Sequence, residues 1–306
     1  MIKKLKERIS EVFVGKEDVV ENVLICLLAG GHVLLEDVPG VGKTTLARSL
    51  ARAVDCDFGR IQFTPDTLPG DVTGISIYNM KTGEFAYREG AVMHQILLAD
   101  EINRTSPKTQ ASLLEAMAEK QVTVDGKVYP LPDPFMVLAT QNPVEFMGTY
   151  PLPEAQVDRF MMRLSIGYPD NDSELIMVRN HLTGKAEEEK EPVLRSGDIV
   201  RMKSEVRSIH VSDGIMQYAR DIIDLTRHEP SFVLGASPRA LISLVCASQG
   251  RAYMDGRDYV KPDDVKATAV NVLHHRLSLT SEARIKGEET DRLLSGLILK
   301  ARIPTE

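Results

Sequence analysis

The chain has 306 residues with a formal net charge of −7, and 43% of the residues are hydrophobic. This length allows one large domain or two ordinary ones, and the hydrophobic share is enough to build a core. The negative charge argues against a general nucleic-acid binder, although a local basic pore is compatible with it.

Cysteine usage and the apolar runs bear on the compartment. The three cysteines, Cys26, Cys56 and Cys246, are far apart, which is typical of neither a disulfide framework nor a zinc site. Charges occupy the N-terminus where a signal peptide needs an apolar run, and no stretch is long and apolar enough to span a bilayer. We therefore expect a cytoplasmic protein that does not insert into a membrane, although its partner could be membrane-bound.

A phosphate-binding loop is predicted early in the chain. Helical periodicity covers residues 3–13 and 17–29, and residues 33–53 then read as a strand, a glycine-rich turn and a helix. Glycine adopts the conformations that aim backbone N–H groups at a polyphosphate, Lys43 can reach the β- and γ-phosphates, and the Thr44 hydroxyl can ligate Mg²⁺. The residues predicted to contact the nucleotide here are Pro39, Gly40, Val41, Gly42, Lys43, Thr44 and Thr45.

This loop departs from the consensus at one position. Asp37 stands where the first glycine of the phosphate loop is usual. We expect an ordinary backbone angle there, because an aspartate at a positive φ would be strained.

The following elements alternate between strands and helices. Apolar or alternating runs predict strands over residues 58–63, 92–99, 135–140 and 160–166, and a helix over 107–120. Turn signals at Lys81-Thr82-Gly83 and Asp125-Gly126 predict β-hairpins over residues 71–90 and 121–131. The alternation predicts an α/β fold with a three-layer αβα core around a parallel sheet, carrying two hairpin insertions.

Two carboxylates follow the strand at 92–99. In a parallel sheet, ligands collect at the carboxyl ends of the strands. Asp100 would face the metal held by Thr44, and Glu101 would polarise the water that attacks the γ-phosphate. Such a pair predicts an ATP-hydrolysing enzyme rather than a simple nucleotide binder. Asn142, after the strand at 135–140, is the candidate to hydrogen-bond the γ-phosphate or the water.

The character of the chain changes after residue 170. A charged stretch, residues 186–192, is a plausible boundary, and the pattern beyond it is mostly helical. Ser237-Pro238 and Lys261-Pro262 are helix starts. We expect a nucleotide-binding core over residues 1–190 and a smaller all-α lid domain over residues 191–306.

The order of these motifs resembles the MoxR family of AAA+ ATPases over nearly the whole chain. The phrases that carry the resemblance are residues 31–45, Asp100-Glu101, residues 140–143, residues 152–160 and Ser237-Pro238-Arg239. Residues 31–40, including Asp37, are similar to the sequence that is usual in this family.

The resemblance implies a role for each matching residue. It assigns Walker A to Lys43 and Thr44, Walker B to Asp100 and Glu101, sensor 1 to Asn142, the arginine finger to Arg159, sensor 2 to Arg239, and the adenine pocket to Val14 and Gly15. The finger would reach the γ-phosphate of the neighbouring subunit, and Arg104 is a further candidate at that interface. The hairpins match insertions that usually point toward the pore of a ring.

The resemblance also implies cofactors and partners. These are ATP and Mg²⁺, self-association into a ring that is usually a hexamer, and chaperone-like remodelling or activation of protein clients. Clients with von Willebrand factor A domains are suggested by the family and not by the residues.

Three other classes of function share single features with this sequence. A GTPase is disfavoured because the chain has Asp71-Val72-Thr73-Gly74 but no Asn-Lys-x-Asp sequence to read guanine. A nucleic-acid motor is disfavoured by the net charge and by the lack of a basic, aromatic stripe. A chelatase-type motor subunit, which helps to insert Mg²⁺ into a porphyrin, has a similarly built core and stays open.

Overall fold

The computed structural model describes residues 1–142, 149–184 and 190–304. Contacts along the chain divide it into two units. The first contains residues 1–21, 32–159 and 164–200, and the second contains residues 22–31, 160–163 and 201–306. The boundary expected between residues 190 and 191 stays a prediction.

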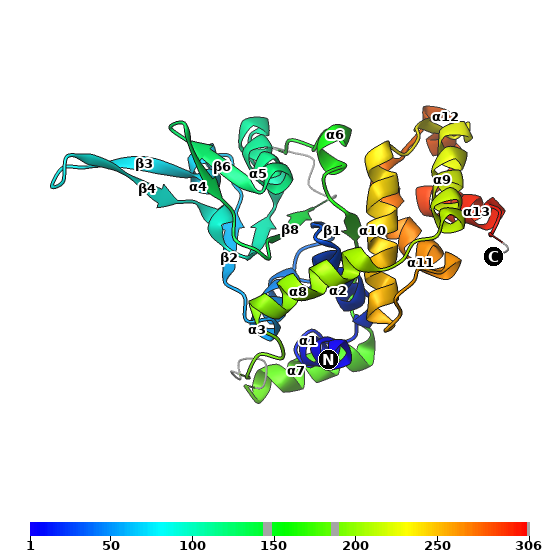
Figure 1. The fold of residues 1–306 in the computed structure, drawn as a ribbon, viewed down its shortest axis with the longest axis horizontal. Coiled ribbons are helices and arrows are strands. Elements are labelled where there is room, and N and C mark those ends of the chain that lie inside the picture. The colour runs from blue at the N-terminus through cyan, green and yellow to red at the C-terminus, as the bar shows by residue number, and fades with distance from the viewer. Residues whose placement is uncertain (143–148, 185–189, 305–306) are drawn as a thin grey trace. The chain divides into compact units, whose positions relative to one another are not determined.

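A five-stranded sheet has the order β2-β5-β8-β1-β9, and its first four strands form the centre of the first unit (Figure 1). Its strands are β1 (Val33–Glu36), β2 (Phe58–Gln62), β5 (Ile96–Asp100), β8 (Met136–Gln141) and β9 (Met162–Leu164). The pairs β2–β5, β5–β8 and β1–β8 are parallel. Residues 96–99 and 136–140 are buried, as expected of interior strands that are apolar on both faces. The predicted parallel sheet is confirmed.

Helices complete the three-layer αβα architecture of this unit. They are α1 (Ile2–Ser10), α2 (Glu17–Ala29, whose last turns belong to the second unit), α3 (Lys43–Ala53), α4 (Pro69–Thr73), α5 (Pro107–Glu119), α6 (Glu154–Val157) and α7 (Asn171–Leu182). Two 3₁₀ turns, η1 (Ala91–Met93) and η2 (Ile102–Arg104), flank β5. α3 packs against β2 and β5, and α1 packs against α3.

Several helices and strands are shorter than the sequence predicts. The first helix ends at Ser10 rather than at residue 13, and the strand expected over residues 92–99 begins only at Ile96. Residues 91–93 are apolar but form the turn η1, so an apolar run in the sequence does not by itself distinguish a turn from a strand. The strand expected over residues 160–166 is reduced to Met162–Leu164.

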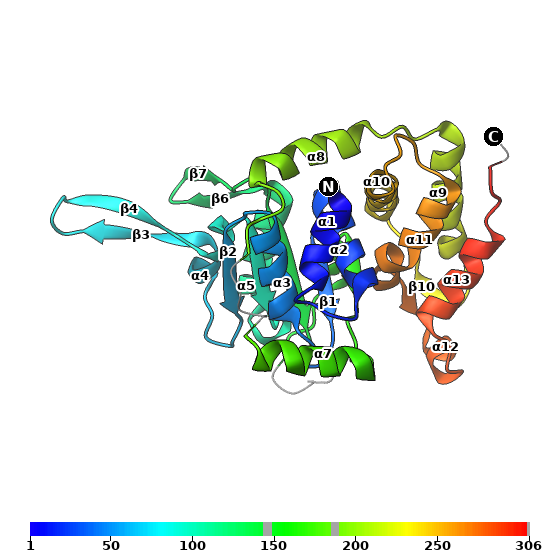
Figure 2. The same cartoon turned by 90° about the horizontal axis from the view of Figure 1, so that it is seen from below.

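Both predicted hairpins are present. β3 (Gly74–Asn79) and β4 (Glu84–Glu89) extend away from the sheet, and β6 (Gln121–Val124) and β7 (Lys127–Pro130) lie beside their base (Figures 1 and 2). The first residues of the expected hairpin, 71–73, belong to α4 instead. Tyr87 donates to Thr73 O at 2.6 Å and stacks on Tyr129 with ring centroids 3.9 Å apart, which ties the two hairpins together.

The second unit is mostly helical. Its elements are α8 (Ser196–Ser208, whose first turn belongs to the first unit), α9 (Asp213–His228), α10 (Pro238–Met254), α11 (Pro262–Leu273), η3 (His274–Arg276), α12 (Ser281–Ile285) and α13 (Thr290–Lys300). The helical lid is confirmed, with the addition of a short antiparallel pair, β10 (Phe232–Leu234) and β11 (Ser278–Leu279). Ser237 caps α10 as expected, because its hydroxyl accepts from Ala240 N at 3.1 Å.

The buried guanidinium of Arg276 binds the backbone of the segment 160–163, which belongs to this unit. Arg276 is 7% exposed and donates to Phe160 O at 2.7 Å and to Met161 O at 3.2 Å. The guanidinium therefore holds the backbone that directly follows Arg159.

Within the described residues, no helix is both long enough and apolar enough to cross a membrane.

Candidate nucleotide-binding site

The phosphate loop connects β1 to α3 and has the conformation that its sequence predicts. Gly40 and Gly42 have φ angles of 88° and 90°, which side-chain-bearing residues rarely adopt. The first hydrogen bond of α3 runs from Leu46 N to Gly42 O. The amides of residues 43–45 therefore precede the helical ladder, at the positive end of the helix dipole. This donor set fits a polyphosphate.

Lys43 lies among the acidic groups of the site. Its Nζ donates to Asp37 O at 2.7 Å. Burial lowers the pKa of the Lys43 ammonium below its ordinary value, against the opposing pull of nearby carboxylates. In decreasing order of effect, these carboxylates are Asp37, Asp100, Glu101 and Glu36. The fold thus brings the lysine of the loop and the predicted Walker B pair together.

The carboxyl ends of three parallel strands meet at this edge of the sheet. Glu36 of β1 pairs with Gln141 of β8, and Ala99 of β5 pairs with Ala139 of β8. This register places Asp100 and Thr140 next to each other. It also explains why residues about 40 and 60 positions apart form one site.

Thr140 fixes the two carboxylates, a role that the sequence did not reveal. Its hydroxyl donates to Asp100 Oδ1 at 2.6 Å and accepts from Glu101 N at 2.8 Å, and the residue is 1% exposed. The sequence places Thr140 in the motif at residues 140–143 but predicts no specific contact for it. What indicates this role is the position of Thr140 next to Asp100 on the neighbouring strand, and that position is known only once the strand order is known.

Polar residues of β2 also reach the pair. Arg60 donates to Asp100 Oδ2 at 2.7 Å, and Gln62 donates to Glu101 Oε2 at 2.7 Å. Arg104 adds a second donor to the same oxygen at 3.0 Å, so it points to Glu101 within its own chain. Each oxygen of Asp100 accepts one of these bonds and keeps a further lone pair, and Asp100 with Thr44 fits the oxygen-ligand preference of Mg²⁺.

Glu101 has a strained backbone. Its φ and ψ are 57° and 50°, in the left-handed region that a glutamate rarely occupies. Such strain is most often found at functional sites, where the surrounding structure holds it in place. Here the Glu101 N–H bond to Thr140 and the parallel strand pairing supply that support.

A cavity of about 400 Å³ adjoins the phosphate loop. Its lining residues are Val12, Phe13, Val14, Lys16, Gly40, Val41, Gly42, Thr45, Ile166, Gly167, Tyr168, Pro169, Glu174, Met177 and Val178. Val14, which the family resemblance assigns to the adenine pocket, lines this cavity. Gly15 does not line the cavity; a Cβ there would come within 2.3 Å of Ser173 Oγ, so its glycine permits close packing against α7. The contribution of α7 and of residues 166–169 was not foreseen.

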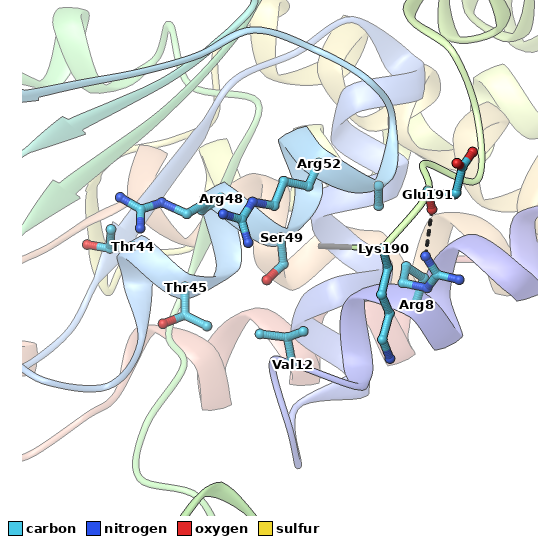
Figure 3. A pocket seen from close by; sticks show the side chains of 10 residues that line it. Arg8, Val12, Thr44, Thr45, Arg48, Ser49, Arg52, Lys190 and Glu191 are labelled. Carbon is cyan, nitrogen blue, oxygen red and sulfur yellow. Dashed lines mark hydrogen bonds between the residues drawn. The ribbon is translucent and has the colours of Figure 1, made fainter. Parts of the chain in front are cut away.

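A second, basic pocket of about 220 Å³ lies on the exposed side of α3 (Figure 3). Arg48 and Arg52 run along this face, with the Arg48 guanidinium near Thr44 and the Arg52 guanidinium near Ser49. On the opposite wall, Arg8 donates to Glu191 O at 2.6 Å. The pocket shares Thr45 and Val12 with the larger cavity, so positive charge borders the predicted nucleotide site.

The remaining predicted residues occupy three different places. Asn142 is 6% exposed and directly follows β8; residues 143–148, which come next in the sequence, lie outside the described residues. Arg159 is half-buried just after α6. Arg239 is exposed in the first turn of α10, in the second unit. Their roles at the nucleotide stay predictions.

Comparisons with known proteins show the family of this chain. Residues 32–162 match the family described as ATPase family associated with various cellular activities, and residues 224–296 match the AAA lid domain. The chain is 50% identical to the uncharacterized protein YeaC of Bacillus subtilis over 100% of this chain and 96% of the relative. It is 40% identical to Chaperone MoxR1 of Mycobacterium tuberculosis over 90% of this chain and 75% of the relative.

Two further comparisons extend the result. The chain is 31% identical to Protein MoxR of Paracoccus denitrificans over 88% of this chain and 86% of the relative. The crystal structure of a Cytophaga hutchinsonii protein described as a candidate ATPase has a TM-score of 0.93 at 40% identity, over 99% of this chain and 95% of the other. The phosphate loop, αβα unit and lid define an AAA+ ATPase. More narrowly, the chain belongs to the MoxR family.

Proposed function

We propose that this protein hydrolyses ATP to ADP and phosphate with Mg²⁺, as a ring of subunits that remodels or activates protein clients. The observation that carries hydrolysis is the Asp100–Glu101 pair at the end of β5, held by Thr140 close to Lys43. A nucleotide binder without catalysis needs the loop but has no use for a strained glutamate beside it.

Each group of the site has a task in this proposal. Lys43 and the amides at the start of α3 bind the phosphates, and Thr44 and Asp100 would hold Mg²⁺, which neutralises phosphate charge when bound. Glu101 accepts a hydrogen bond from the attacking water and so orients it toward the γ-phosphate. Asn142 binds the same water or a γ-phosphate oxygen.

Assembly would complete the site. Arg159 is half-buried and forms no ion pair with any residue in the described ranges. A guanidinium in this state is suited to act in trans, on the nucleotide of a neighbouring subunit. Arg239, as sensor 2, would report the state of that nucleotide to the lid. The family relationship supports a ring, with six subunits as the expected number.

The β3–β4 hairpin supports contact with protein clients. Its exposed apolar side chains include Met80 and Phe85, which are 89% and 70% exposed. A solvent-exposed apolar tip of this kind favours transient binding to another protein. Proteins with von Willebrand factor A domains are the client class that the family suggests.

The variant Glu101→Gln tests hydrolysis. It should bind ATP as the wild type does, while turnover falls by about 10²–10⁴-fold because the amide does not accept the water's proton. Glu115→Gln, at an exposed position of α5, is the matched control and should retain full turnover. Near-normal turnover of Glu101→Gln would contradict the assignment.

The same variant tests the partner class. Held in ATP, it should retain a protein client in pull-down experiments. Turnover by the wild type should rise with that client and not with single-stranded DNA. Stimulation by DNA would favour a nucleic-acid motor, and stimulation only by a porphyrin-metallating partner would favour a chelatase subunit.

A further inference from the structure

Asp37, the residue that breaks the phosphate-loop consensus, makes an unusual number of hydrogen bonds. It is 7% exposed, and its Oδ2 accepts from Gly167 N at 2.8 Å, from Ser165 Oγ at 3.2 Å and from Ile166 N. Its Oδ1 accepts from Val38 N at 3.1 Å. Glycine at this position would leave these donors without their acceptor.

The backbone of Asp37 explains why the loop tolerates it. Its φ angle is not positive, in contrast to those of Gly40 and Gly42. The strained part of the loop therefore begins after Asp37. The side chain is free to turn away from the phosphates while its carbonyl oxygen accepts from Lys43 Nζ at 2.7 Å.

The segment that Asp37 holds is one wall of the larger cavity. Residues 166–169 line that cavity on one side, and residues 12–14 and 40–42 contribute other parts of it. The proposed phosphate site lies at Lys43 and Thr44, so this cavity is the place left for the base. One carboxylate thus connects the loop that binds phosphates to the wall that faces the base.

The buried carboxylate of Asp37 requires several hydrogen-bond donors. A buried carboxylate is expensive unless several donors satisfy it, and three donors from one short segment do so here. Hydrogen bonds to a charged acceptor are stronger than neutral ones. The bonds therefore fix the distance between segment 165–167 and the phosphate loop more firmly than apolar packing would.

We propose that Asp37 is a positioning residue that ties the base-pocket wall to the phosphate loop, so that the base and the triphosphate of one nucleotide are bound in a single geometry. This inference rests on the proposed binding of ATP. It assigns Asp37 to the base end of the ligand, although the residue belongs to the phosphate loop in sequence.

The test compares two ligands on the full chain. Dissociation constants are measured for Mg²⁺-ATP and for Mg²⁺-tripolyphosphate, which lacks the base and the ribose. For Asp37→Ala, affinity for ATP should fall by roughly tenfold. Affinity for tripolyphosphate should be unchanged or higher, because a negative charge near Lys43 is removed and the carbonyl contact to Lys43 is kept.

Further variants show what a selective loss of ATP affinity and a loss of affinity for both ligands look like. Tyr168→Ala shortens the same wall and should reproduce the selective loss of ATP affinity. Lys43→Ala removes the phosphate contact and should weaken both ligands. Asp37→Asn keeps one acceptor oxygen and should shift the ratio of the two affinities in the same direction by less, so it provides the test if Asp37→Ala does not fold.

The outcomes separate this inference from the proposed function. A parallel loss of both ligands in Asp37→Ala and Asp37→Asn, or an unchanged ratio of their affinities, would overturn the positioning role. Failure of the wild-type chain to bind ATP would instead overturn the proposed function.

Discussion

The Thr140 hydroxyl donates to Asp100 Oδ1 at 2.6 Å, and Thr140 Oγ1 accepts from Glu101 N at 2.8 Å. One buried side chain on β8 thus holds both members of the acidic pair at the end of β5. The arrangement depends on the parallel pairing of these strands.

Removing this hydroxyl should impair both activity and stability. Thr140→Val keeps the shape but leaves the part-buried Glu101 N–H without its acceptor. We expect ATP turnover to fall by roughly tenfold and stability by about 1–3 kcal/mol, measured by steady-state kinetics and urea unfolding. Thr140→Ser, which keeps the hydroxyl, should retain turnover and stability. Thr123→Val, at an exposed position of β6, should change neither quantity. Full activity of Thr140→Val would show that the contact is dispensable.

Arg159 should act between subunits. Arg159→Ala is expected to fold normally but to lose turnover, since the guanidinium would stabilise transition-state charge on a neighbour's nucleotide. Mixing it in equal amounts with Lys43→Ala should restore about a quarter of the sites, because half of the subunits keep Lys43 and half of their neighbours keep Arg159. Arg220→Ala is the control for loss of an exposed arginine. No recovery in the mixture would argue against a shared site.

His275 should make the second unit sensitive to acid. Burial lowers the pKa of His275 well below its ordinary 6.5, and Arg276 lowers it further, with smaller effects from Arg163 and His274. The hydrogen bond to Phe160 O acts in the opposite direction. The imidazole is therefore neutral in the folded chain but takes up a proton in the unfolded chain below about pH 6.5.

The sign of the pH effect follows from linkage. Because the unfolded state binds more protons, stability should fall as the pH drops below about 6.5, by up to about 1.4 kcal/mol per pH unit for this one group. Urea unfolding of His275→Gln between about pH 5 and 7 should show a shallower dependence. His228→Gln, at an exposed site, should keep the wild-type slope. Equal slopes for all three proteins would contradict the prediction.

Gly90 should be required at the base of the β3–β4 hairpin. A Cβ there would lie 2.2 Å from Gly74 N and 2.4 Å from Val72 O, so Gly90→Ala should cost about 1–3 kcal/mol and expose the hairpin to proteolysis. Gly296→Ala meets no atom within 4 Å in α13 and should instead stabilise by about 0.5–1 kcal/mol. Wild-type stability of Gly90→Ala would rule out the close approach.

Local chemistry made much of this protein predictable from the sequence. Glycine at 40 and 42, lysine at 43 and carboxylates after an apolar strand each have a chemical role that their residue type and immediate neighbours predict. Helix starts at Ser237 and Lys261 were equally local, since a cap acts on amides two or three positions away. Family resemblance added Arg159 and Arg239, whose roles stay predictions.

The tertiary structure decided which distant residues meet. Strand order placed Thr140 beside Asp100, and it brought Gln62 of β2 to Glu101. The return of the chain through residues 165–167 gave Asp37 its partners. None of these contacts follows from composition or periodicity, because the residues are about 40 to 130 positions apart and hydrogen bonding depends on distances that only the packed sheet sets.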